Sequence, residues 1–194
     1  MNSIDSTTMN LLVVFILVLI AVIGGVIYQR TKSRKLQEHF GDEYHHAVDA
    51  LGSRSKAERE LEERRKRVEK LDIVPLSPDE AARFGQAWRH LQSQFVDNPK
   101  AVLADADRLV RELMLKRGYP MGDFERRAAD ISVDHPQVVD HYRAAQAVAL
   151  RDRNGQADTE DLRKAVVHYR ALFEELLEVA PTQPVTGTHA AART

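Results

Sequence analysis

The sequence predicts an all-α protein with a single N-terminal transmembrane helix, a charged helical stalk and then an antiparallel helical bundle. Three observations predict this fold. Eighteen consecutive uncharged and mostly apolar residues run from Leu11 to Tyr28. Downstream, apolar residues recur every three or four positions, which is the period of an amphipathic helix. Capping residues, prolines and glycines divide that pattern into segments, and no series of strands is indicated.

The apolar run is long enough to cross a membrane. An α-helix rises about 1.5 Å per residue, so a helix over residues 9–29 spans roughly 30 Å, the thickness of a hydrocarbon core. Four basic residues follow it at once, whereas residues 1–8 carry one acid and no base. By the positive-inside rule, residues 1–8 form a short extracytoplasmic N-terminus. Residues 30–194 then face the cytosol at the plasma (inner) membrane.

A cleaved signal peptide is the alternative for this N-terminus. Such a peptide needs a basic first region, an apolar stretch of about 7–15 residues and a small-residue cleavage site. Here the first region has no basic side chain, the apolar run is longer, and no Ala-x-Ala pattern follows Gly24-Gly25. These differences favour a retained anchor.

The composition and the missing motifs argue against several classes of protein. The chain has 28 basic and 29 acidic side chains, a net charge of −1, so steering toward nucleic acid is not expected and we predict no specific nucleic-acid partner. It has no cysteine, which rules out thiol catalysis, disulfides and thiolate metal sites. It also lacks a Gly-x-Ser-x-Gly elbow and a glycine-rich phosphate loop. We therefore predict a protein that is not an enzyme and needs no cofactor.

The membrane-proximal part is predicted to be a stalk. Residues 30–35 form a basic juxtamembrane segment, and residues 36–74 form a helical stalk with a break near 52–54, at Gly52-Ser53. The first half carries one apolar stripe, which includes Leu36, Phe40 and Tyr44. Ser55 with Glu58 is a capping-box pattern that opens the second half. In that half Arg64 occupies a position of the apolar seam.

Residues 75–179 are predicted to form the bundle, because amphipathic helices with short connections bury their stripes only against one another. Four helix starts are predicted from Ser77-Pro78-Asp79-Glu80, Asn98-Pro99, Asp123, and Asp158 or Thr159. A fifth is predicted from Asp134 with Pro136 and Gln137. Gly118 and Asn154-Gly155 mark helix ends. Residues 180–194 are small and polar, and we predict a disordered tail.

A four-residue sequence occurs twice in the predicted bundle. His141-Tyr142-Arg143-Ala144 recurs as His168-Tyr169-Arg170-Ala171. So short a repeat is weak support for a duplication. We interpret each tyrosine as a residue at the edge of the core with a charged neighbour in solvent.

One polar cluster combines carboxylates and imidazoles in a short stretch. It consists of Asp130, Asp134, His135, Asp140 and His141. Such groups are ligands for a metal ion, but His135 and His141 are six residues apart and point to different helix faces. Asp134 is already explained as a cap. We therefore predict no metal site in this cluster.

A second cluster repeats every three or four residues, as adjacent metal ligands on one helix face would. It contains Glu38, Asp42, His45 and Asp49. A helix face rich in acids is usually only solvated, so we again predict no metal site. A cryptic metal-binding or small-ligand-binding protein stays an alternative.

The basic juxtamembrane residues Arg30, Lys32, Arg34 and Lys35 are candidate lipid-headgroup ligands. Near an anionic leaflet each adds about 1 kcal/mol to membrane binding. Their simpler role is to set the orientation of the anchor. Binding to an anionic lipid or nucleic-acid surface is a further alternative for the whole protein. Against it, glutamates flank the basic run at residues 64–67, and no aromatic residue lies nearby for stacking.

Several short stretches are typical of one group of proteins. They include Phe40-Gly41-Asp42-Glu43-Tyr44, Arg117-Gly118-Tyr119-Pro120 and Ser132-Val133-Asp134-His135-Pro136. Over about residues 39–178 the chain resembles a widespread family of uncharacterised bacterial helical proteins, often membrane-anchored. The resemblance implies a helical domain and a bacterial source, and it implies no reaction, ligand or partner.

These observations together predict a single-pass membrane-anchored protein. Its cytosolic helical domain is expected to be an adaptor or scaffold that binds a protein partner, which the sequence does not identify. The anchor, the charged stalk and the missing reactive constellation are the features that favour this interpretation.

Overall fold

The computed structural model describes residues 6–178, and over that range the protein is all-helical, with eight helices and no strand. The helices are α1 (Ser6–Phe40), α2 (Asp42–Leu51), α3 (Arg54–Val68), α4 (Pro78–Ser93), α5 (Pro99–Lys116), α6 (Phe124–Asp134), α7 (Pro136–Arg153) and α8 (Thr159–Leu176). The predicted tail, residues 180–194, and residues 1–5 of the predicted N-terminal segment lie outside the described residues.

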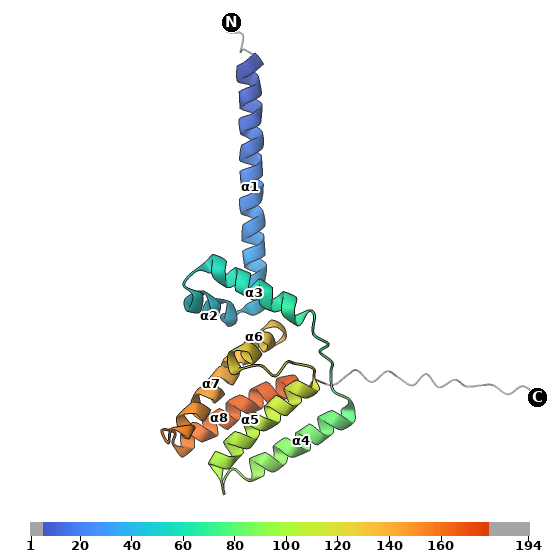
Figure 1. Cartoon of the computed structure of the whole chain (residues 1–194), viewed down its shortest axis with the longest axis vertical. Helices are drawn as coiled ribbons and strands as arrows, with labels where there is room; N and C mark the ends of the chain where they lie inside the picture. Colours follow the sequence, from blue (N-terminus) through green and yellow to red (C-terminus); the bar gives the residue numbers. More distant parts are fainter. Residues whose placement is uncertain (1–5, 179–194) are drawn as a thin grey trace, which may run out of the picture.

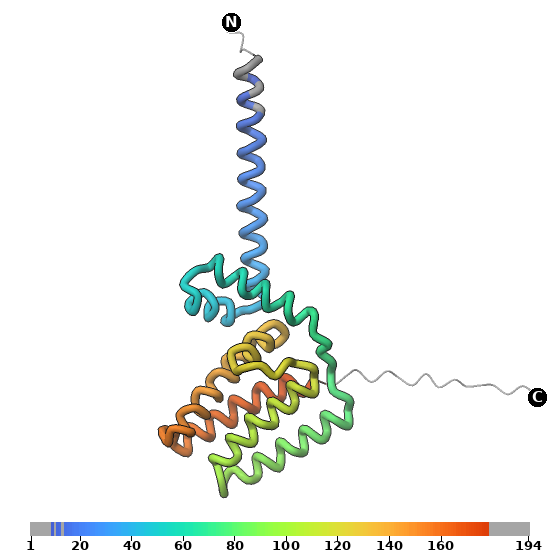
Figure 2. Tube along the Cα trace, viewed as in Figure 1, coloured from blue at the N-terminus to red at the C-terminus, as the bar shows by residue number. Residues whose placement is uncertain are grey.

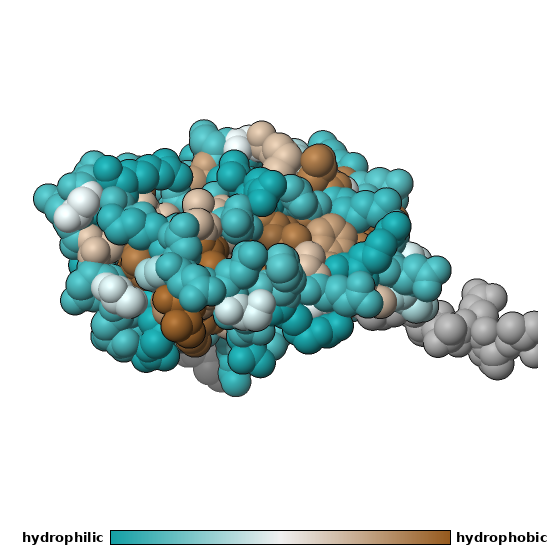
Figure 3. All heavy atoms as spheres, turned by 90° about the horizontal axis from the view of Figure 1, so that it is seen from below, coloured by the Kyte–Doolittle hydropathy of each residue, from teal (hydrophilic) through white to brown (hydrophobic). Residues whose placement is uncertain are grey.

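Helix α1 projects away from the other helices (Figure 1). Its stretch Val14–Phe40 contains a window that is apolar enough to cross a membrane, and none of that window is buried. The length and apolar composition of this helix indicate a membrane span, and a signal sequence near an N-terminus shares both properties. The end of the molecule opposite α1 has a mostly hydrophilic surface (Figure 3). Among the described residues, most of the exposed large hydrophobic side chains belong to α1.

The predicted stalk packs against the other helices. Leu36 and Phe40, at the end of α1, are buried together with residues of α2, α3 and α6. We call this cluster the α1–α3 core; its buried members are Leu36, Phe40, Tyr44, Ala47, Ala57, Leu61, Val68 and Val133. Helices α2 and α3 thus lie between α1 and the remaining helices, as Figure 1 shows.

The stalk differs from the prediction in two places. The sequence predicts one helix through Phe40 and Tyr44, but the chain turns at Gly41, where φ is +51°. Glycine adopts this conformation at little cost, so the apolar spacing continues across the turn. The predicted break at Gly52 is confirmed. The predicted cap at Ser55 is wrong, because α3 already begins at Arg54.

A larger core lies among α4, α5, α7 and α8, with α6 at its side. Helix α7 packs along α8, α8 along α5, and α5 along α4. The core includes two pairs of buried aromatic side chains, with Trp88 stacked on Phe173 at 4.6 Å between ring centroids and Tyr142 edge-on to Tyr169. Because Tyr142 and Tyr169 are fully buried, the interpretation of both as core-edge residues is wrong.

The helix starts of this part follow mostly from local capping. Ser77 and Glu80 form the predicted capping box, and Asn98, Asp123 and Asp158 each accept a hydrogen bond from the backbone of the following turn. The predicted cap at Asp134 is wrong. Asp134 is the last residue of α6, and α7 begins at Pro136 after His135, whose side chain makes no capping hydrogen bond.

The connection between α3 and α4, residues 69–77, runs along one side of the molecule (Figure 2). Backbone hydrogen bonds hold it, from Val74 N to Arg117 O at 2.9 Å and from Leu76 N to Glu178 O at 3.0 Å. Gly118 has φ of +96°, and a Cβ at this position would lie 2.3 Å from the carbonyl oxygen of Asp72. The close approach of these two backbones therefore requires glycine.

Candidate functional site

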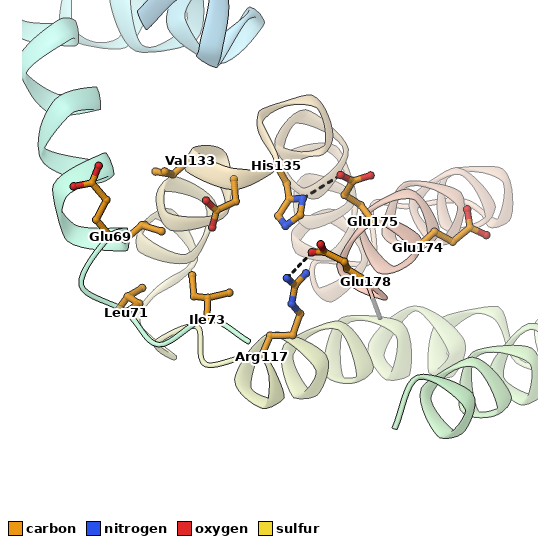
Figure 4. A pocket seen from close by; sticks show the side chains of 11 residues that line it. Glu69, Leu71, Ile73, Arg117, Val133, His135, Glu174, Glu175 and Glu178 are labelled. Atoms are coloured by element: carbon orange, nitrogen blue, oxygen red, sulfur yellow. Dashed lines mark hydrogen bonds and ion pairs between the residues drawn. The ribbon is translucent and has the colours of Figure 1, made fainter. Parts of the chain in front are cut away.

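A cavity lies where this connection passes the ends of α6 and α8. It is open to solvent and has a volume of about 760 Å³. We call it the His135 cavity, and Figure 4 shows its side chains. Its lining consists of Val68, Glu69, Leu71, Ile73, Arg117, Val133, Asp134, His135, Glu174, Glu175 and Glu178. Five carboxylates therefore face one guanidinium and one imidazole, beside an apolar wall.

Arg117 holds the base of the His135 cavity together. Its side chain is only 4% exposed. Its guanidinium donates to the backbone oxygens of Val74 and Leu176, each at 3.3 Å, and to the carboxylate of Glu178 at 2.9 Å. One side chain thus joins the connection, α5 and the end of α8. Arg117 is a structural clamp, and its charge is already matched by Glu178.

His135 is buried at the edge of the same cavity. Its Nδ1 lies 3.0 Å from Oε1 of Glu175, and the amide of Gln137 donates to the same oxygen at 2.6 Å. Its Nε2 is buried and has no hydrogen-bond partner among the described residues. Nearby, the hydroxyl of Tyr119 donates to Asp134 at 3.2 Å. Burial and the charge of Asp134 both raise the pKa of Tyr119, so its hydroxyl stays protonated.

These features define what the His135 cavity can bind. Glu69 and Glu174 are exposed at its rim, and Leu71, Ile73 and Val133 give it an apolar wall. A cationic side chain with an apolar stem matches such a surface, because the stem packs on the wall while the charge meets the carboxylates. The lining is therefore complementary in charge to a cationic side chain.

A second arrangement links α2 and α3 to the rest of the protein. Glu43 is fully buried, and its carboxylate accepts hydrogen bonds from Arg64 at 2.6 Å and from Arg143 at 2.5 and 2.9 Å. Burial raises the pKa of Glu43, but the hydrogen bonds and charges of Arg143 and Arg64 outweigh burial and hold the pKa below 4.5. Asp130, which is 1% exposed, accepts from Arg67 at 2.8 Å. Sequence reasoning missed these pairs, although the basic Arg64 in an apolar seam was a signal for one of them.

The first predicted polar cluster is dispersed in the structure. Each of its five residues has its own partner: Asp130 with Arg67, Asp134 with Tyr119, His135 with Glu175, Asp140 with Arg143, and His141 with His168. No group of three or more histidines and carboxylates with the geometry of a metal site occurs within residues 6–178. The sequence explains Asp134 as a helix cap. In the structure, its carboxylate instead accepts a hydrogen bond from the hydroxyl of Tyr119.

The second cluster loses its shared face at the turn of Gly41. Glu38 lies on α1 and forms an ion pair with Arg34 at 2.8 Å. Asp42, His45 and Asp49 lie on α2, which takes a new direction. The Nε2 atom of His45 is 3.4 Å from the amide nitrogen of Gln37.

The four candidate lipid ligands separate into two groups. Lys32 and Lys35 line a cavity of about 430 Å³ between α1 and α3, which we call the Lys32 cavity. Arg30 and Arg34 do not line it, and Arg34 is paired with Glu38. Arg65 of α3, which the sequence did not single out for this role, is the third basic residue of the cavity.

The repeated sequence brings two histidines together. Nδ1 of His141 lies 2.9 Å from Nδ1 of His168, across the contact between α7 and α8. One imidazole donates and the other accepts, so the contact requires at least one neutral ring. Partial burial and the charge of His141 lower the pKa of His168.

In comparisons with known proteins, the chain matches no family model, no curated protein and no solved structure. The resemblance to a bacterial family stays a prediction. The function is therefore argued from the geometry of the molecule alone.

Proposed function

We propose that this protein is a single-pass membrane-anchored adaptor that presents a helical protein-interaction domain to the cytosol. In this proposal residues 1–8 lie outside the plasma (inner) membrane. We also infer an antiparallel bundle for α4, α5, α7 and α8, because short connections favour that arrangement of neighbouring helices.

One observation carries the proposal: α1 passes from its exposed apolar stretch into the folded domain without a break. The apolar stretch ends at Tyr28, and the same helix continues to Phe40. Leu36 is 5% exposed and Phe40 is fully buried in the α1–α3 core. A helix that spans a membrane would therefore hold the domain at a defined distance and orientation, as an adaptor requires.

The His135 cavity supports the protein-interaction part of the proposal. It is open, it is rich in carboxylates and it has an apolar wall. We assign it the contact with a basic segment of the partner protein. Specificity would come from matching charges on the partner, because a wrong arrangement of charges costs binding energy.

The test is crosslinking in cells followed by affinity purification of the tagged full-length protein. A version without residues 1–29 is the comparison, and mass spectrometry quantifies the captured proteins. We expect one protein to be enriched near stoichiometric amounts with the full-length chain and to be lost with the truncated chain. Capture of no protein above background would contradict the adaptor role.

Two matched variants test the proposed contact surface. Glu69→Lys reverses a charge at the rim of the His135 cavity, and Glu63→Lys reverses another exposed charge, on α3 outside the cavity. We expect Glu69→Lys to reduce capture of the partner about tenfold, as the loss of one charge-assisted contact would. Glu63→Lys should leave capture unchanged. Equal effects of the two variants would place the contact elsewhere.

A further inference from the structure

The Lys32 cavity has the composition of an anion-binding site. It is formed by one face of α1 and the neighbouring side of α3. On α1 the face contains Tyr28, Thr31, Lys32 and Lys35, whose spacing of three, one and three residues places them on the same side of a helix. Arg65 reaches the cavity from α3. Two hydroxyl groups and three cations therefore surround one volume of about 430 Å³, together with Leu36, His39 and one carboxylate, that of Glu62.

The charges of this cavity are only partly neutralised by the protein. Arg65 forms ion pairs with Glu62 at 2.8 Å and with Glu69 at 3.6 Å. No carboxylate within residues 6–178 forms an ion pair with Lys32 or Lys35. Both lysines are exposed, so their ammonium groups are available to an incoming anion.

The position of the cavity along α1 narrows the class of ligand. Tyr28 is the last residue of the apolar run, and Lys32 and Lys35 follow it by four and seven residues. At about 1.5 Å per residue the two lysines lie roughly 6 and 10 Å beyond the apolar stretch. The phosphate groups of a bilayer occupy this interfacial zone, just outside the hydrocarbon core. Above the cavity, the exposed apolar side chains of α1 offer a surface for acyl chains.

We propose that the Lys32 cavity binds the phosphate group of an anionic phospholipid. Lys32 and Lys35 supply the charge, Arg65 supplies a directional guanidinium from α3, and the acyl chains lie along the apolar part of α1. This inference rests on the proposed membrane anchoring. It goes beyond a general attraction of basic residues to the membrane, because it assigns Lys32 and Lys35 to a site and leaves Arg30 and Arg34 outside it.

The experiment uses the full-length protein in detergent micelles and native mass spectrometry with added lipid. The probes are phosphatidylglycerol, which is anionic, and phosphatidylcholine, which carries a phosphate but no net charge. Lys32→Gln/Lys35→Gln is compared with Arg30→Gln/Arg34→Gln, which removes two charges from the same segment outside the cavity. Arg65→Gln tests the contribution of α3. These side chains are exposed, so each variant is expected to keep the fold, which circular dichroism checks.

We expect the wild type to prefer phosphatidylglycerol. Lys32→Gln/Lys35→Gln should weaken that binding on the order of tenfold, Arg65→Gln severalfold, and Arg30→Gln/Arg34→Gln less than about twofold. Equal losses in the two double variants would overturn the site in favour of a diffuse charge effect. Equal binding of the two lipids by the wild type would overturn it as well.

Two further experiments distinguish a lipid headgroup from free phosphate, and the headgroup site from the membrane anchor. Inorganic phosphate at millimolar concentration should not displace the lipid, and displacement would show a site for free phosphate instead. Alkaline carbonate extraction of cell membranes tests the anchor by itself. Retention of all variants in the membrane, together with equal lipid binding, would overturn the headgroup site and leave the adaptor proposal standing. Release of the wild type would overturn both.

Discussion

Arg143 of α7 and Glu43 of α2 lie 100 residues apart in the sequence, yet two hydrogen bonds join the guanidinium to the fully buried carboxylate. Arg64 of α3 binds the same carboxylate from a third helix. One buried acid thus joins α2 and α3 to α7. This ion-pair network is one of the links between the α1–α3 core and the larger core, beside the pair of Arg67 and Asp130.

Replacing this acid should destabilise the protein strongly. Glu43→Gln keeps the size of the side chain but removes the buried carboxylate, which leaves Arg64 and Arg143 with only the more exposed Glu60 and Asp140 as ion-pair partners. We expect a loss of about 3 kcal/mol in the free energy of unfolding, because breaking a buried ion pair leaves uncompensated charge. Denaturant unfolding of the full-length protein in detergent measures it, followed by the fluorescence of Trp88, the single tryptophan.

The matched control is Glu38→Gln, since the pair of Glu38 and Arg34 is largely exposed. It should cost less than about 1 kcal/mol in the free energy of unfolding.

The lowered pKa of Glu43 also predicts that stability depends on pH. Because it lies below 4.5 in the folded protein, the stabilisation is fully present above that pH and is lost as the pH falls below it. Glu43→Gln should flatten this acid limb, and an unchanged limb would contradict the assignment.

The contact of His141 with His168 predicts that replacing His141 changes the pKa of His168. His141→Gln removes one of the two causes that lower the pKa of His168, the neighbouring charge, and leaves partial burial. We expect the pKa of His168 to rise toward 6.5 in the variant, as followed by the NMR shift of its ring proton from about pH 5 to 8. In the wild type, neutral His168 contributes to stability because its pKa is lowered in the folded protein. That contribution is fully present above pH 6.5 and is lost as the pH falls below it. His90→Gln on α4 should leave the titration of His168 unchanged.

Gly118 predicts a stability effect at the connection between α3 and α4. Gly118→Ala places a Cβ at 2.3 Å from the Asp72 oxygen, at a φ of +96°. We expect a loss of about 2–4 kcal/mol in the free energy of unfolding, because the backbones must separate. Gly85→Ala, inside α4, meets only the tip of Arg89 at 3.5 Å and should stabilise by about 0.5–1 kcal/mol. A neutral Gly118→Ala would show that the connection is not held as described.

The features that sequence reasoning found are those that depend on near neighbours. Ser77, Asn98 and Asp123 start helices through bonds to residues three positions later. The turn at Gly41 was missed because the apolar spacing of Phe40 and Tyr44 continues across it. A positive φ at a glycine does not change the spacing of the apolar residues in the sequence.

The features that sequence reasoning missed depend on distant partners. Asp134 follows the pattern of a cap, but Tyr119 on another segment binds its carboxylate. The four basic residues after the apolar run were found as one group. In the structure, Lys32 and Lys35 line a cavity and the two arginines do not. This difference depends on where α3 packs, and so does the presence of Arg65 in the cavity. A single sequence carries no local signal of that packing.

The last prediction concerns the coupling of the anchor to the domain. Phe40 is fully buried in the α1–α3 core, which is separate from the larger core. Phe40→Ala should therefore loosen α2 and α3 and leave α4, α5 and α8 protected. The expected cost is about 3–5 kcal/mol, which corresponds to amide exchange more than about a hundredfold faster in α2 and α3. Hydrogen exchange with mass spectrometry measures this in the full-length protein.

Phe15→Ala is the matched control for Phe40→Ala, because it makes the same change in the same helix at a side chain that is 66% exposed. It should leave exchange in α2 and α3 unchanged. If Phe40→Ala accelerated exchange equally in α4 and α5, the two cores would unfold as one unit. The α1–α3 core would then not be a separate joint between the anchor and the domain. Faster exchange confined to α2 and α3 would instead show that this joint responds independently, as expected where an anchor helix packs on its own small core.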